Sequence, residues 1–166
     1  TASRSVCKEC CVRPMRKEKH RMPPEECEAF LARAEVLRLG LADEDGPYVV
    51  PVNFGYEDGR LYVHGPAEGR RLDAIAANPR VCFEADECEI VRAVRSCGFT
   101  ARFRSVIGYG SARVLTDDGA RRRGLDVLMR HYGGTGADYD ERVLAQTSVI
   151  EIEIDSMDGK RHLVGG

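Results

Sequence analysis

Short turn signals divide the first half of the chain into segments in which apolar and other side chains alternate. Leucines alternate over residues 37–41, and the sequence DEDG at residues 43–46 then predicts a turn. A second strand is expected over residues 48–54, a turn at the EDG of residues 57–59, and a third strand over residues 60–64. Two hairpins within this short stretch predict antiparallel sheet, because such short connections cannot join parallel strands.

Three later segments also have strand character. Alternate residues of 81–85 are apolar, and residues 103–115 form a long segment in which Gly108 and Gly110 permit a bend. Residues 148–156 alternate isoleucine with acidic side chains, which is typical of a strand with one buried face. The total of about six strands predicts a mainly β fold, a closed or split barrel, rather than a parallel α/β sheet.

Three helices are expected around these strands. Proline and acidic residues begin a helix at residue 24, and apolar residues at helical spacing carry it to about residue 37. A short helix is expected over residues 70–77, before Asn78-Pro79, and another through residues 125–132. Residues 86–101 have no assignable pattern.

Composition describes one globular domain without a membrane or nucleic-acid partner. The 166 residues are 43% hydrophobic and 31% charged, with a formal net charge of −2. No apolar run approaches the roughly 20 residues of a spanning helix, and no signal peptide is recognised, so a cytoplasmic location is expected. We divide the chain into a basic, cysteine-containing extension (residues 1–22), a domain (residues 23–160) and a tail (residues 161–166).

The segment from His64 to Asp73 is the strongest candidate for a binding site. A glycine-flanked loop there opens directly into the expected helix, whose free backbone N–H groups favour an anion. Arg70 and Arg71 lie where their guanidinium groups could reach the same anion. The structural alternative is a pair of solvated arginines and a hydrogen-bonded His64 without a role in chemistry.

Two further segments could contribute to this site. Pro51 interrupts a strand, so that backbone groups over residues 51–54 are free to meet a flat heteroaromatic edge. Arg104 and Ser105 could donate to a phosphate. Taken alone, each segment is also consistent with an ordinary strand.

These segments together resemble a known family. Residues 51–56, 58–64, 69–73, 78–83 and 105–110 are similar, in order, to the pyridoxamine 5′-phosphate oxidase-like split-barrel flavoproteins. The closest branch is that of the nitroimidazole-resistance (Nim-type) reductases. The resemblance runs from about Met15 to Lys160.

The resemblance implies a six-stranded antiparallel split β-barrel whose homodimer holds two FMN molecules between subunits. It implies that the phosphate lies near Gly69, Arg70, Arg71 and Ser105, and the isoalloxazine along residues 51–54 with His64 beside it. Relatives often carry lysine at the position of Arg71. The expected flavin-binding residues are therefore Pro51, Val52, Asn53, Phe54, His64, Gly69, Arg70, Arg71, Arg104, Ser105 and Val106, and His64 is the expected catalytic residue.

The resemblance also implies electron transfer from reduced nicotinamide, NAD(P)H, to a small acceptor such as a nitroaromatic compound. Gly108-x-Gly110 lacks the third glycine and the helix of a Rossmann site, so the nicotinamide is expected to bind only transiently at the flavin. Two alternatives stay open: a non-catalytic flavin- or haem-binding protein, with His64, His131 or His162 as haem ligand, and an F420-dependent reductase on the same barrel.

The N-terminal cysteines are weak metal candidates. Cys7, Cys10 and Cys11 form a Cys-x-x-Cys-Cys sequence, but no second Cys-x-x-Cys pair completes a four-ligand zinc site. We therefore expect no metal and an incidental extension. Met15 is a candidate start of the native chain.

Overall fold

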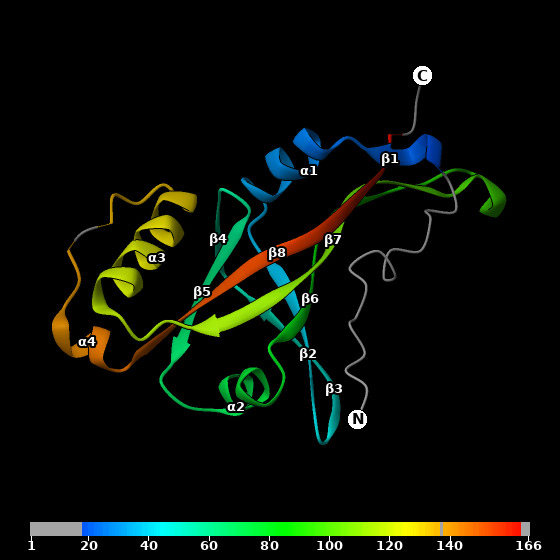
Figure 1. The fold of residues 1–166 in the computed structure, drawn as a ribbon. Helices are drawn as coiled ribbons and strands as arrows, with labels where there is room; N and C mark the ends of the chain where they lie inside the picture. Colours follow the sequence, from blue (N-terminus) through cyan, green and yellow to red (C-terminus); the bar gives the residue numbers. More distant parts are fainter. Residues whose placement is uncertain (1–17, 137, 164–166) are drawn as a thin grey trace.

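The structure is a computed structural model that describes residues 18–136 and 138–163 (Figure 1). The candidate metal ligands Cys7, Cys10 and Cys11, and the candidate start Met15, lie outside the described residues. Within the described ranges, no helix is both long and apolar enough to cross a membrane.

One antiparallel sheet contains all strands of the described residues. Its order is β3-β2-β6-β7-β8-β5-β4, and β1 pairs with β8. The strands are β1 (Arg21–Met22), β2 (Leu37–Asp43), β3 (Gly46–Val52), β4 (Phe54–Glu57), β5 (Arg60–Pro66), β6 (Arg80–Val91), β7 (Thr100–Val114) and β8 (Thr147–His162). The expected mainly β architecture with peripheral helices is confirmed.

The sheet closes on itself through a single residue. β3 and β4 stand at opposite ends of the strand order, yet only Asn53 separates them in the chain. The sheet must therefore curl until its two edges meet, which is the geometry of a split barrel. If β3 and β4 are counted as one interrupted strand and the two-residue β1 is set aside, six strands remain.

Alternate side chains fill the barrel. In β2 the three leucines are buried, and in β6 the apolar residues Val81, Phe83 and Ala85 are buried, as their alternation predicts. Phe83 pairs with Gly108 of β7, and a Cβ at Gly108 would overlap the Phe83 ring. The glycine predicted to permit a bend therefore also makes room for a fully buried phenylalanine of the core.

The helices lie around the barrel (Figure 1). They are α1 (Pro24–Leu31), α2 (Arg70–Ala77), α3 (Asp118–His131) and α4 (Glu141–Ala145), with short 3-10 turns at Glu18–His20 and Ser96–Gly98. α2 packs on β2 and β7, and α3 packs on β4, β5 and β8. A small second core lies beneath α3 and α4 and contains Leu115, Leu125, Leu144 and Val149.

Several expected boundaries differ from the structure, among them the start of the third helix, since α3 begins at Asp118 rather than near residue 125. The prediction that the first helix runs to residue 37 is wrong: α1 ends at Leu31, because Leu37 already pairs with Val52. The unassigned residues 86–101 continue β6 to Val91 and start β7 at Thr100, around an exposed tip. β8 is longer than expected because its last residues pair with β7 and with β1, whose two residues lie in the predicted extension.

Candidate functional site

The strand register places Asn53 beside His64. The β4–β5 ladder pairs Phe54 with Val63, so Asn53 and His64 are the next pair beyond its end. Phe54 and Val63 are buried, and their neighbours Asn53 and His64 are exposed. Because successive side chains of a strand point to opposite faces, Asn53 and His64 lie together on the outside of the barrel. Two of the predicted segments therefore meet here.

The chain then passes from His64 into α2 without a capping side chain. Residues 66–69 are exposed, and Gly69, the residue before the helix, has a φ of +124° that favours glycine. No side chain accepts a hydrogen bond from the first turn of the eight-residue α2. The Leu72 and Asp73 N–H groups donate to the Gly69 carbonyl oxygen, so the N–H groups of Arg70 and Arg71 and the positive end of the helix dipole are the features that an anion could meet.

Arg71 is held against this loop with its hydrogen-bonding capacity largely unused. Its Nη2 donates to the His64 carbonyl oxygen at 3.3 Å, and its Nε is buried without a hydrogen-bond partner among the described residues. A Cβ at Gly65 would overlap Nη2, so the glycine leaves the space that the guanidinium occupies. Burial lowers the pKa of Arg71. An unpaired buried donor is costly, and a bound anion would remove that cost.

Arg70 is already paired. Its Nε and Nη2 donate to the two carboxylate oxygens of Asp43 at 2.7 and 3.1 Å, and its guanidinium lies 4.6 Å from the centre of the Tyr48 ring. The hydrogen bonds from Arg70 lower the pKa of Asp43. Arg70 therefore contributes little net charge to the loop, and Arg71 is its main uncompensated cation. Asp43 and Tyr48 were not predicted, since no sequence signal connects them with Arg70.

The surroundings of His64 favour its neutral form. Partial removal of its ring from water, and then the positive charge of Arg71, lower the pKa of His64 from its usual 6.5. A neutral imidazole carries one donor and one acceptor nitrogen, so His64 can hydrogen-bond to a ligand without adding charge.

Tyr132 fixes the break between β3 and β4. Its hydroxyl accepts hydrogen bonds from the Phe54 backbone N–H at 3.1 Å and from Asn53 Nδ2 at 3.4 Å, and it donates to the Glu35 carbonyl oxygen at 2.6 Å. Of the predicted ring-binding segment, Val52 and Phe54 point into the core, whereas Pro51 and Asn53 are exposed. The sequence signal for Tyr132 was only its helical spacing.

The third predicted segment lies apart from this loop. Two strands, β2 and β6, separate β3 from β7, so Ser105 is about three strand spacings, roughly 14 Å, from the Pro51 strand. Arg104 pairs with Glu87 at 2.8 Å, and Val106 is fully buried. One copy of the chain therefore does not bring Arg104 and Ser105 to Arg71.

The three candidate haem-binding histidines do not gather. His131 Nε2 lies 2.7 Å from the Ala34 carbonyl oxygen, and its ring packs on Phe54, whereas His162 packs on His20. His64 is on β5. In the part of the chain that the structure describes, no group of three His, Cys, Asp or Glu residues could hold a metal ion.

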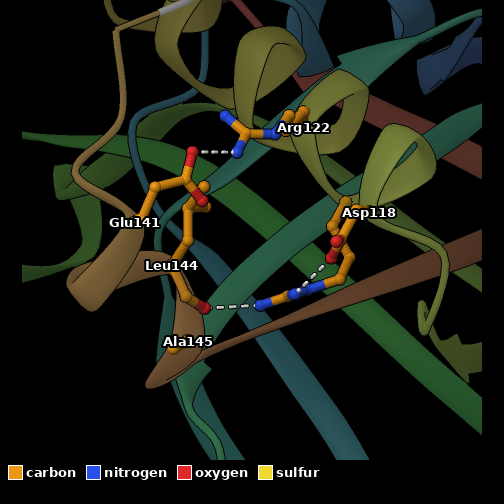
Figure 2. Close-up of a pocket in the computed structure, with 6 residues that line it drawn as sticks. Asp118, Arg122, Glu141, Leu144 and Ala145 are labelled. Atoms are coloured by element: carbon orange, nitrogen blue, oxygen red, sulfur yellow. Dashed lines mark hydrogen bonds and ion pairs between the residues drawn. The ribbon is translucent and has the colours of Figure 1, made fainter.

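A small pocket of about 240 Å³ lies between α3 and α4, and none of the predicted site residues lines it (Figure 2). Arg122 donates to Glu141 at 2.5 Å across it. Arg121 donates to the Leu144 carbonyl oxygen at 2.5 Å and to Asp118 at 2.9 Å. These contacts hold α4 against α3. The polar side chains that line the pocket are therefore explained by the packing of the two helices.

Comparison with known proteins supports the fold and limits the range of candidate functions. A family model described as pyridoxamine 5′-phosphate oxidase matches residues 23–161. A proposed 5-nitroimidazole antibiotic resistance protein from Bacteroides thetaiotaomicron is 29% identical, with a TM-score of 0.75 over 84% of this chain and 85% of that chain. A FAD-binding protein from Mesorhizobium loti is 26% identical, with a TM-score of 0.64 over 86% and 96% of the two chains.

Two further similar proteins support the fold alone or match only part of the chain. The flavocytochrome of Azotobacter vinelandii is 22% identical, with a TM-score of 0.76 over 93% of this chain and 75% of that chain, which shows the fold alone. An uncharacterised protein of Rhizobium meliloti (strain 1021) is 29% identical over 85 residues, 51% of this chain. The match spans only 56% of that curated relative.

Proposed function

Because the chain belongs to the pyridoxamine 5′-phosphate oxidase family, we propose that it is an oxidoreductase that binds FMN where β5 leads into α2. The phosphate lies at the first turn of α2 beside Arg71. The isoalloxazine ring lies along the exposed Pro51 and Asn53, next to His64. A cytoplasmic location is part of this proposal, because reduced nicotinamide is available there.

One observation carries the proposal: the half-buried guanidinium of Arg71, whose Nε has no hydrogen-bond partner in the part of the chain that the structure describes. A protein pays a stability cost for such a group unless a ligand completes it. The neighbouring N–H groups of α2 favour the same ligand, a phosphate, because they lack a capping side chain. FMN is favoured over riboflavin on this ground.

The residues around the ring have distinct tasks in this proposal. Bound flavin supplies the capacity to take up two electrons from reduced nicotinamide and to pass them to an acceptor. Arg71 and the dipole of α2 balance the charge of the phosphate. His64, as a neutral imidazole beside the ring, donates or accepts a hydrogen bond and can hold a proton close to the acceptor.

The proposed acceptor is a nitroaromatic compound. The support is the 29% identity over most of both chains to the nitroimidazole-resistance relative. Family members differ in activity on one fold, so the acceptor has to be established by assay.

We also propose that two copies of the chain share the flavin. Val49, Ile107 and Tyr109 are 64%, 46% and 42% exposed on the outside of the sheet. Val49 pairs with Gly40, Gly40 with Cys82, and Cys82 with Tyr109, so these four residues form one row across four strands, and Ile107 lies two residues from Tyr109 along β7. An exposed apolar row favours association with a partner. A second copy could also supply the Arg104 and Ser105 that one copy keeps away from Arg71.

Reconstitution tests the proposal. The purified protein is titrated with FMN, FAD, riboflavin and haem, and binding is followed by absorbance. We expect a stoichiometric FMN complex in a dimer, with FMN bound at least roughly tenfold more tightly than riboflavin, because the phosphate adds charge-assisted hydrogen bonds. The loaded protein should oxidise NAD(P)H in the presence of a nitroaromatic compound.

Replacement of the half-buried Arg71 and of the exposed Arg130 provides a matched comparison. Arg71→Ala should release FMN, whereas Arg130→Ala, which removes an arginine paired with Glu57 on the surface at 2.8 Å, should retain it. His64→Ala should lower turnover more than flavin content. A protein that takes up none of the flavins refutes the proposal, and a Soret band after haem titration supports the haem-binding alternative instead.

A further inference from the structure

We propose that Asn53 recognises the pyrimidine edge of the flavin ring, the imide that carries N3–H, and that Tyr132 positions Asn53 for this contact. The inference rests on the proposed flavin site and identifies the residue that forms hydrogen bonds with the ring. It is carried by the hydrogen bonds that meet at the break between β3 and β4.

The hydroxyl group of Tyr132 has all its hydrogen bonds assigned. A phenol has one donor and two acceptor sites. The donor goes to the Glu35 carbonyl oxygen at 2.6 Å, and the acceptors take the Phe54 N–H at 3.1 Å and Asn53 Nδ2 at 3.4 Å. The hydroxyl therefore cannot turn to another partner without breaking one of these bonds, and it defines the orientation of the Asn53 amide.

This orientation leaves a specific pair of groups on Asn53 for a ligand. With one Nδ2–H directed at Tyr132, Oδ1 points away from the tyrosine, and no hydrogen bond from the described residues reaches it. The second Nδ2–H remains as a donor. An outward acceptor next to a donor matches the N–H and C=O neighbours of an imide, which flavins carry at the end of the ring remote from the dimethylbenzene.

The position of Asn53 fits the same ligand. Asn53 is exposed and lies beside His64 on the neighbouring strand, and Arg71 donates to the His64 carbonyl oxygen. The order Asn53, His64, Arg71 therefore runs from the proposed ring to the proposed phosphate. A ligand that is anionic at one end and has an imide at the other would meet complementary groups at both ends.

The anchor of this arrangement is rigid. Tyr132 follows directly on α3, and α3 packs closely on β4: a Cβ on Gly55 would lie 2.7 Å from the Leu128 backbone. The ring of the adjacent His131 packs on the Phe54 side chain, with 4.7 Å between ring centres. The Tyr132 hydroxyl is thus fixed relative to the strand break, which is what a positioning residue requires.

The test compares FMN with FMN methylated at ring N3, which has lost the imide N–H. Dissociation constants are measured by fluorescence titration for the wild-type protein and for Asn53→Ala, Tyr132→Phe and Tyr139→Phe. Tyr139→Phe is the matched control, because it removes a hydroxyl that donates to Asp126 at 2.8 Å, away from the strand break. Unfolding temperatures are measured for each apo-protein.

We expect the wild-type protein to prefer FMN over the N3-methyl compound by about fivefold or more, the value of one net hydrogen bond. The preference should fall towards one in Asn53→Ala and in Tyr132→Phe, and it should persist in Tyr139→Phe. A role of Tyr132 in stability alone would lower the unfolding temperature without changing this ratio.

The outcomes separate this inference from the proposed function. FMN binding with an unchanged preference in Asn53→Ala overturns the assignment of Asn53 and leaves the flavin site in place. An unchanged preference in a folded Tyr132→Phe overturns the positioning role. If the wild-type protein binds neither compound, the proposed function fails and the inference falls with it. Asn53 is exposed, so Asn53→Ala should still fold. It can therefore test the contact with the pyrimidine edge even if Tyr132→Phe does not fold.

Discussion

Replacement of Arg71 by methionine should stabilise the apo-protein and weaken FMN binding, two effects of opposite sign. Methionine keeps an unbranched apolar stem but removes the guanidinium, whose Nε is buried without a partner. An unsatisfied buried donor costs about 1–3 kcal/mol, and for the half-buried Arg71 we take about 1 kcal/mol. In a domain of this size that corresponds to a rise of about 2–4 °C in the unfolding temperature.

The same substitution removes contacts to the phosphate. Two charge-assisted hydrogen bonds at about 1.5 kcal/mol each amount to about 3 kcal/mol, or roughly a 100-fold increase in the dissociation constant of FMN. Riboflavin lacks the phosphate, so its dissociation constant should change little.

The assay combines thermal unfolding of the apo-protein with titrations of FMN and riboflavin. Arg130→Met is the control, because Arg130 is an exposed arginine that pairs with Glu57. A phosphate-binding role of Arg71 is contradicted if Arg71→Met lowers the unfolding temperature by several degrees and weakens the binding of FMN and riboflavin to the same extent. Arg71 would then be a structural residue.

Three further substitutions probe the site and its support. Gly65→Ala should weaken FMN while keeping every charge, because the new Cβ would displace Arg71; titration should show a smaller FMN-to-riboflavin preference and no change in riboflavin binding. The pKa of His64 is lowered in the folded protein, so the unfolded chain binds the proton more readily, and stability should decline as the pH falls through about 6.5. His64→Gln should reduce this decline in denaturant titrations at pH 5.5 and 7.5, and an identical pH dependence would contradict the assignment. Gly55→Ala should cost about 1–3 kcal/mol of unfolding free energy, because its Cβ would lie 2.7 Å from the Leu128 backbone, which cannot turn aside; an unchanged unfolding temperature would show that α3 adjusts.

Local sequence patterns predicted most of the sheet and its helices. The alternation over β2, β5 and β6 was sufficient because each of these strands has one face in the barrel core. In β8 the alternation does not hold over residues 148–152, because Val149 and Glu151 on the other face are buried as well. The errors occurred where partners far along the chain decide the outcome. α1 ends early because Leu37 is needed opposite Val52, and β8 extends because β1 and β7 pair with its end.

The candidate site was predicted only in part. The glycine-flanked loop and the two arginines are neighbours in sequence, so their proximity needed no tertiary information. The pairing of Arg70 with Asp43 was not predictable, because the two residues are 27 positions apart and meet only when α2 packs on β2. Because of this pairing, Asp43 balances the charge of Arg70, whereas no carboxylate of the described residues balances the charge of Arg71.

The sequence by itself determined which segments are strands, where the chain turns and which loop begins a helix, because these depend on side-chain period, glycine and proline. Contacts between distant parts of the chain establish that Asn53 lies beside His64, that Tyr132 holds the strand break, and that Arg71 Nε has no hydrogen-bond partner among the described residues. The physical reason is that barrel closure joins strands which are distant in the chain, and register, burial and hydrogen-bond partners arise from that closure.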